Sequence, residues 1–201
     1  IYIHQDVQKN PITQRVLQYN VEWMQIPYEI VTGARGIHRK ENFFDTIHAP
    51  NQAARNINSG RRILFLQHYT RTFVEREDAR HNQDNAPNIY NQGDDVCYSV
   101  KLGRMCCFNC HYCYNYVVNQ VWAEYSAYVN IEDMMQEMTE VANEKTGGKK
   151  TFFLGEQTDS FAIDPATQMT TELVPLIATL PNSQAEFRTK SADIDNLEGL
   201  D

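Results

Sequence analysis

The chain has 201 residues, of which 42% are hydrophobic and 11% aromatic, so it can bury a core and is not intrinsically disordered. Its formal net charge of −8 excludes a basic nucleic-acid-binding surface over the whole chain. The charge does not exclude a local basic groove. No apolar run approaches the roughly 18–20 residues that cross a membrane. Because the chain starts at Ile1 and stops within a helical pattern at Asp201, we expect it to be part of a longer protein.

The first part of the sequence, residues 1–92, predicts a small α/β region. Residues 75–93 are polar and contain asparagine, proline and glycine, which indicates a linker or a long loop before the next domain. The apolar patterns that precede this segment predict one strand, one helix and two further strands, at residues 1–3, 13–23, 28–31 and 63–66.

The second part, residues 93–201, alternates strands and helices. Such an alternation indicates parallel strands joined by crossover helices. Three strand–helix units are too few to close a barrel, so we expect an open sheet or the first part of a larger barrel. The expected strands are 96–102, 151–154 and 185–189, and the expected helices begin at the capping residue Asn130 and at Asp164, which precedes a proline.

A cluster of cysteines follows the strand expected over 96–102. Four of the five cysteines in the chain lie within residues 106–113, which indicates metal or redox chemistry and a cytoplasmic protein rather than a disulfide framework. Cys106, Cys110 and Cys113 have the spacing C-x3-C-x2-C, and cysteine thiolates hold iron–sulfur clusters. Three protein ligands leave one iron of a [4Fe–4S] cluster open for the amino and carboxylate groups of S-adenosylmethionine (SAM).

Other interpretations of these cysteines stay open. A zinc site would use four ligands, usually in two separated pairs, whereas these thiols lie within eight residues. A redox pair could use Cys107 with Cys110, or Cys110 with Cys113, which leaves a third cysteine unexplained. Cys107 also leaves the register of the ligands open, because Cys107, Cys110 and Cys113 are evenly spaced. Cys97 lies in an expected strand, and we expect it to be a small buried hydrophobic residue.

The C-x3-C-x2-C triplet, with an aromatic residue before its last cysteine, resembles the signature of the radical SAM superfamily. The likeness to the spore photoproduct lyase family is more specific, because further segments occur in the order and nearly at the spacing of that family. It covers nearly the whole chain, strongly over 98–191 and weakly over 1–92, and it implies an α/β fold of the radical SAM partial (β/α) barrel type. The matching segments are Cys110-His111-Tyr112-Cys113-Tyr114, Tyr128-Val129-Asn130, Thr158-Asp159 with Ile163-Asp164, and Phe187-Arg188-Thr189-Lys190.

The resemblance implies roles for five residues. Tyr112 would pack near the SAM adenine, and Tyr114 would lie beside the radical site as a catalytic residue. Lys190 would reach the SAM carboxylate, and Thr158 and Asp159 would contact its methionyl or ribose part. Alternatively, the two tyrosines are core aromatics and Asp159 caps a turn. The resemblance also implies a flavodoxin- or ferredoxin-type electron donor and no membrane.

The sequence departs from the family at one chemically important position. The family has a cysteine after the second strand that supplies a hydrogen atom to the product radical, whereas Glu156 stands there in this chain and no cysteine follows Cys113. Gly155-Glu156 is similar instead to the GE motif of other radical SAM proteins, whose carboxylate binds the SAM amino group through a charge-assisted hydrogen bond. We therefore expect radical formation to be intact and the terminating step of the lyase reaction to be lost.

Three functions follow from these observations. The first is a radical SAM enzyme resembling spore photoproduct lyase, which reductively cleaves SAM to a 5′-deoxyadenosyl radical and acts on a DNA lesion or a nucleotide-like substrate. The second is a radical SAM enzyme whose substrate is unrelated to DNA. The third is a non-catalytic iron–sulfur or zinc-binding protein.

Overall fold

The computed structural model of the chain describes residues 1–32, 64–77, 94–108, 110, 112–113, 125–145 and 148–200. The chain forms two compact units, each built from two separate stretches of sequence, and each is described by itself. The predicted domains, 1–92 and 93–201, divide the chain differently, and that boundary stays a prediction. Unit 1 comprises Ile1–Tyr69 and Gly103–Asn130, and unit 2 comprises Thr70–Leu102 and Ile131–Asp201.

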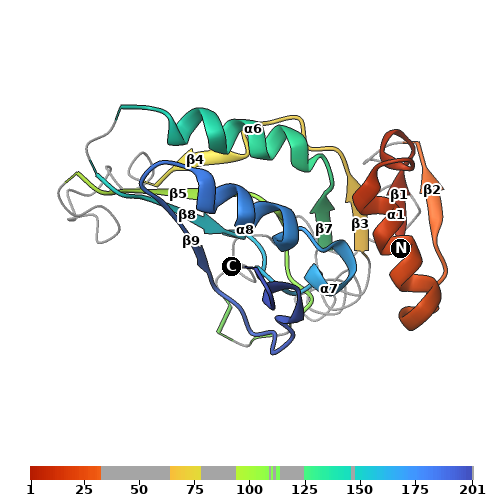
Figure 1. Cartoon of the computed structure of the whole chain (residues 1–201). Helices are drawn as coiled ribbons and strands as arrows, with labels where there is room; N and C mark the ends of the chain where they lie inside the picture. The colour runs from red at the N-terminus through yellow and green to blue at the C-terminus, as the bar shows by residue number, and fades with distance from the viewer. Residues whose placement is uncertain are drawn as a thin grey trace. The chain divides into compact units, whose positions relative to one another are not determined.

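Unit 1 contains a five-stranded sheet with the strand order β2-β1-β3-β7-β6. The pairs β1–β2, β1–β3 and β3–β7 are parallel, and β6 runs antiparallel to β7. The central strands supply its core, since Ile3, Phe65, Leu66 and Ala127 are at most 1% exposed. The strands, labelled in Figure 1, span Tyr2–His4 (β1), Glu29–Val31 (β2), Leu64–Gln67 (β3), Gly103–Arg104 (β6) and Tyr125–Tyr128 (β7).

The connection between β1 and β2 is helical, as the sequence predicts. Asn10 caps the helix α1, because its side-chain oxygen accepts a hydrogen bond from Ile12 N at 2.9 Å. Pro11 occupies the first turn, where its missing N–H has no partner to lose. The helix predicted over 13–23 therefore starts earlier, and its last part is a π-helix. The helical segments are Gln5–Val7 (3-10), Pro11–Tyr19 (α1) and Asn20–Met24 (π).

Strands β6 and β7 are not predicted from the sequence. Strand β7 reads Tyr-Ser-Ala-Tyr, and alanine is depleted in strands, so neither propensity nor alternation marks it. All four of its residues are buried, because it lies between β3 and β6 inside the sheet. Packing within the sheet, rather than local preference, therefore determines this strand.

Unit 2 contains a four-stranded sheet with the order β4-β5-β8-β9. The pairs β5–β8 and β8–β9 are parallel, which confirms the predicted parallel strands, and β4 is antiparallel to β5. The prediction of a linker from residue 75 is wrong at its start, because a short polar strand lies there. The strands span Val74–Arg76 (β4), Val96–Val100 (β5), Lys150–Leu154 (β8) and Ser183–Phe187 (β9).

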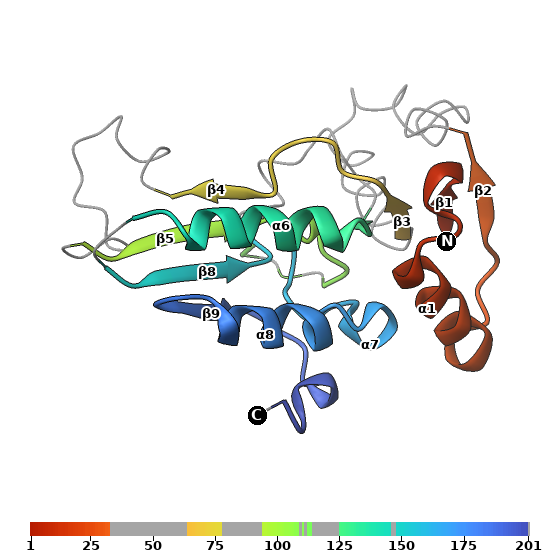
Figure 2. The ribbon, with the colours of Figure 1, turned by 45° about the horizontal axis from the view of Figure 1, so that its top comes forward.

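Helices α6 and α8 lie along the same face of this sheet (Figures 1 and 2). Met134 and Met138 of α6 are one turn apart and fully buried, as are Leu173 of α8 and Phe152 of β8, so an apolar layer joins helices and sheet. Among the residues that the structure describes, no helix is long and apolar enough to cross a membrane. The helical segments are Ile131–Ala142 (α6), Asp164–Thr167 (α7), Thr170–Thr179 (α8) and the 3-10 turn Asp195–Leu197.

A buried lysine closes the end of α6. The side chain of Lys150, the first residue of β8, is almost completely buried. Its Nζ donates hydrogen bonds to the carbonyl oxygens of Ala142 and Glu144, at 2.5 and 2.8 Å. A cation at a helix C-terminus satisfies carbonyl groups that have no partner within the helix. Lys150 therefore joins the last turn of α6 to the start of the next strand.

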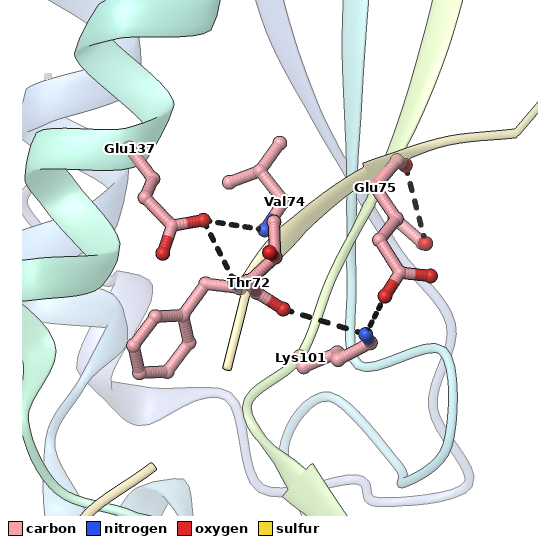
Figure 3. Close-up of polar contacts among 7 residues, drawn as sticks. Thr72, Val74, Glu75, Lys101 and Glu137 are labelled. Atoms are coloured by element: carbon pink, nitrogen blue, oxygen red, sulfur yellow. Dashed lines mark hydrogen bonds and ion pairs between the residues drawn. The ribbon is translucent and has the colours of Figure 1, made fainter. Parts of the chain in front are cut away.

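The edge strand β4 is attached on both sides by charged side chains (Figure 3). Glu137 of α6 accepts hydrogen bonds through Oε2 from the backbone N–H groups of Phe73 and Val74, at 2.7 and 3.1 Å. Lys101 forms an ion pair with Glu75. Because β4 has only three residues, these contacts supplement a short set of ladder hydrogen bonds.

We expect Glu137→Ala to lower the free energy of unfolding of the full-length protein by about 1.5–3 kcal/mol, because two backbone N–H groups lose a charged acceptor. Urea denaturation followed by far-UV circular dichroism measures the change. Glu140→Ala, an exposed position on the same helix, is the matched control and should change stability by less than about 0.5 kcal/mol. Equal losses in both variants would contradict the attachment of β4 by Glu137.

Candidate functional site

The cysteine loop starts from a tightly packed pair of strands in unit 1. Gly103 pairs with Ala127, and a Cβ atom at Gly103 would lie 2.1 Å from the carbonyl oxygen of Ser126, so only glycine fits there. Met105 follows in the left-handed region, with φ of 60°, and its side chain is 1% exposed. The close strand contact and the buried methionine together fix the point from which the cysteines leave the sheet.

The cysteines of this loop differ in exposure. Cys106, Cys110 and Cys113 are half-buried, whereas Cys107 is exposed, and these four described cysteines form no disulfide. Phe108 N donates a hydrogen bond to Cys106 Sγ at 3.4 Å. Within the described part of the chain, no three His, Cys, Asp or Glu side chains lie close enough together to hold a metal ion. The structure therefore places three half-buried thiols in one loop without bringing them together as a ligand set, and the ligand assignment stays a prediction.

Of the two tyrosines of the cysteine loop, the structure describes only Tyr112. Tyr112 is 76% exposed, so the alternative of a core aromatic is wrong for this residue. Tyr114, the predicted catalytic residue, lies outside the described residues.

In unit 2, a tight loop follows β8 and carries three of the predicted SAM contacts. Gly155 has φ of 95°, and Thr158 N donates a hydrogen bond to its carbonyl oxygen at 3.1 Å, which closes the turn. Glu156 is half-buried in this turn. The hydroxyl oxygen of Thr158 is buried and has no hydrogen-bond partner among the described residues. Such a group is costly to leave unpaired, so it suits a polar atom of a bound molecule.

Asp159 and the end of β9 form one network. The Asp159 side chain is 9% exposed, and its carboxylate accepts hydrogen bonds from Phe161 N, Thr189 Oγ1 and Lys190 N at 3.0, 2.7 and 2.6 Å. The structure thus brings Asp159 and the backbone of Lys190 together, while the Lys190 side chain is exposed. Ser160, which the sequence analysis does not single out, takes part in the same network, and its position directly after Asp159 is the only sequence signal for it.

Cys97 is confirmed as a buried residue of β5. Its side chain is 3% exposed. Burial, together with the carboxylates of Glu77 and Glu186, raises the pKa of the Cys97 thiol to about 11. The thiol is therefore neutral at physiological pH and is not suited to bind a metal ion there.

A comparison with protein families identifies the family of the chain. The family model described as spore photoproduct lyase matches residues 92–201, more than half of the chain. The chain belongs to the spore photoproduct lyase family. This is a family of the radical SAM type, and the matched residues include the cysteine loop and the ends of β8 and β9. No curated protein sequence matches the chain.

Solved structures of spore photoproduct lyase are similar to the chain in fold. A complex with dinucleoside spore photoproduct has a TM-score of 0.71 and 18% sequence identity over 98% of the chain. A mutant with bound AdoMet and dinucleoside spore photoproduct has a TM-score of 0.70, also at 18% identity over 98% of the chain. The chain covers 51% of each of these structures, so it spans about half their length. The likeness confirms the predicted fold class, an α/β fold of the radical SAM partial-barrel type.

For this member of the spore photoproduct lyase family, we expect anaerobic reconstitution to load about four irons and four sulfides per chain. Cys106→Ala, Cys110→Ala and Cys113→Ala should each abolish iron binding, because each removes a thiolate ligand. Iron and sulfide analysis measures the outcome. Cys107→Ala is the matched control and should retain the cluster, since this thiol is exposed. Loss of iron on replacing Cys107, with retention on replacing Cys106, would shift the ligand register.

Proposed function

We propose that the chain is part of a radical SAM enzyme that binds a [4Fe–4S] cluster through Cys106, Cys110 and Cys113. The observation that carries the proposal is the family match over residues 92–201, which contain the C-x3-C-x2-C triplet. When bound, the cluster and SAM would supply a 5′-deoxyadenosyl radical. The reaction needs a low-potential electron donor of the flavodoxin or ferredoxin type, which fits the cytoplasm as the location.

The loop after β8 and the end of β9 would hold the methionyl part of SAM. Glu156 would accept hydrogen bonds from its ammonium group, and Lys190 would donate to its carboxylate. Thr158 would offer its hydroxyl, and its burial without a partner among the described residues supports this role. For Asp159, the next residue in the chain, the resemblance implies a contact with the methionyl or ribose part of SAM.

The resemblance also gives roles to the two tyrosines of the cysteine loop. Tyr112 would stack on the adenine, and its 76% exposure supports an aromatic surface that is free of the core. Tyr114 would act beside the radical, directly after the last cluster cysteine. A non-catalytic iron–sulfur or zinc-binding protein would lack these SAM contacts, and SAM binding separates that alternative from an enzyme.

A DNA photoproduct is the first candidate substrate, because similar solved structures hold dinucleoside spore photoproduct. A substrate unrelated to DNA is the second candidate, and it is favoured by Glu156 at the position of the family's hydrogen-donating cysteine. A carboxyl O–H bond is too strong to give a hydrogen atom readily to a carbon radical. The net charge of −8 points in the same direction, because DNA binding draws on phosphate neutralisation by basic residues.

We expect Glu156→Gln and Lys190→Met each to weaken SAM binding by about 10- to 150-fold, because each removes a charged hydrogen bond worth about 1.5–3 kcal/mol. Isothermal titration of SAM into cluster-loaded, full-length protein measures the affinity. Glu198→Gln and Lys149→Met, at exposed positions, are matched controls that should leave it unchanged. Unchanged affinity in both test variants would remove Glu156 and Lys190 from the site.

We expect the full-length protein to form 5′-deoxyadenosine but to repair spore photoproduct poorly, because Glu156 stands where the resemblance puts the family's hydrogen-donating cysteine, so that donor for the product radical is missing. Anaerobic incubation with dithionite, SAM and a dinucleotide photoproduct, followed by chromatography, measures both products. Stoichiometric repair to thymidylyl-thymidine would contradict the expectation. 5′-Deoxyadenosine without repair would support a different substrate.

A further inference from the structure

Two consecutive residues of the loop after β8 hold the end of β9. We call Asp159 and Ser160, with the segment 188–190 that they bind, the strand-end clamp. Asp159 binds the Thr189 hydroxyl and the Lys190 N–H through different carboxylate oxygens, Oδ1 and Oδ2. Ser160 binds the preceding residue, because Arg188 N donates to Ser160 Oγ at 3.0 Å and Ser160 N donates to the Arg188 carbonyl at 3.3 Å. Three successive residues of the chain beyond β9 are thus held by two residues of a neighbouring loop.

The clamp holds the chain beyond the point where the sheet ends. The last paired residues of β8 and β9 are Leu154 and Phe187, so ladder hydrogen bonds no longer fix Lys190. The Ser160 hydroxyl also donates to the carbonyl oxygen of Leu154, which ties the clamp to the end of β8. Thr189 Oγ1 in turn accepts a hydrogen bond from Ser191 N at 2.8 Å. The backbone on both sides of Lys190 is therefore held by side chains instead of by a strand.

We infer that Asp159 is a positioning residue, which acts on SAM through Lys190 rather than by touching SAM; the inference rests on the proposed function. Both carboxylate oxygens already accept hydrogen bonds from the chain itself, and the side chain is 9% exposed. Lys190 instead presents an exposed side chain from a backbone that Asp159 fixes. A long, flexible ammonium side chain binds a carboxylate more tightly when its backbone is held in advance, because less freedom is lost on binding.

The substitution Asp159→Asn separates positioning from a general loss of structure. Asparagine has the shape of aspartate, and its one oxygen can still accept hydrogen bonds from Phe161 N and Thr189 Oγ1. Its amide nitrogen then faces the Lys190 N–H, which is also a donor, so the bond to Lys190 is lost. Asp193→Asn, at an exposed position of the same chain segment, is the matched control.

The test is a double-mutant cycle on the full-length, cluster-loaded protein, with SAM affinity measured by isothermal titration. We expect Asp159→Asn and Lys190→Met each to weaken SAM binding about tenfold or more, and the double variant to bind no more weakly than Lys190→Met alone. Losses that multiply in the double variant would overturn the inference, because they would show a contact of Asp159 with SAM that does not pass through Lys190. An unchanged affinity of Lys190→Met would overturn it as well.

Failure of the proposed function has a different signature, since the unsubstituted protein would then not bind SAM, and the inference would fall with it. A second readout examines the clamp without any cofactor: in cluster-free protein, Asp159→Asn should speed amide hydrogen exchange over residues 188–191, and Asp193→Asn should not. Unchanged exchange would overturn the inference.

If Asp159→Asn does not fold, Thr189→Val removes one bond of the same network. Its effect on SAM affinity should disappear in the Lys190→Met background, and a persisting effect would overturn the inference.

Discussion

The parallel pairing of β8 with β9 is the constraint on which the site in unit 2 depends. Parallel strands end at the same edge of a sheet, so the residues that follow Leu154 and those that follow Phe187 are neighbours. This register lets a carboxylate in the first loop reach a backbone N–H that is 31 positions further along the chain. Only because β8 and β9 end at the same edge does Asp159 lie within hydrogen-bond distance of Lys190 N.

The sequence alone predicts those helices and strands whose buried residues recur at a regular spacing or form an apolar run. Helix α6 carries methionines one turn apart and starts directly after the predicted capping residue Asn130, and β8, a short apolar run, lies close to its predicted bounds. Strands β4 and β7 carry no such mark, because one is polar and short and the other contains serine and alanine, so only their partners determine them. The C-x3-C-x2-C spacing indicated the cluster chemistry, but spacing says nothing about how the thiols are oriented before metal binding.

The network around Asp159 shows the limit of prediction from motifs. A Thr-Asp pair in a family motif suggests ligand contact, whereas the hydrogen bonds of Asp159 depend on the register between two distant strands. Glu156 shows the complementary limit, because the resemblance sets it at the place of a family thiol although the chain shares the fold. Fold and chemistry are thus separable, and a family resemblance constrains the first more strongly than the second.

Lys150 and its neighbour Lys149 differ in their reactivity towards amine reagents, because the Lys150 ammonium group is buried. Its Nζ donates to the carbonyl oxygens of Ala142 and Glu144 and the residue is 3% exposed, so acylating reagents and modifying enzymes do not reach this nitrogen while unit 2 is folded. Lys149, next to it, is exposed to both. Amine labelling at this pair of lysines therefore reports whether the joint between α6 and β8 is intact, independently of any bound cofactor.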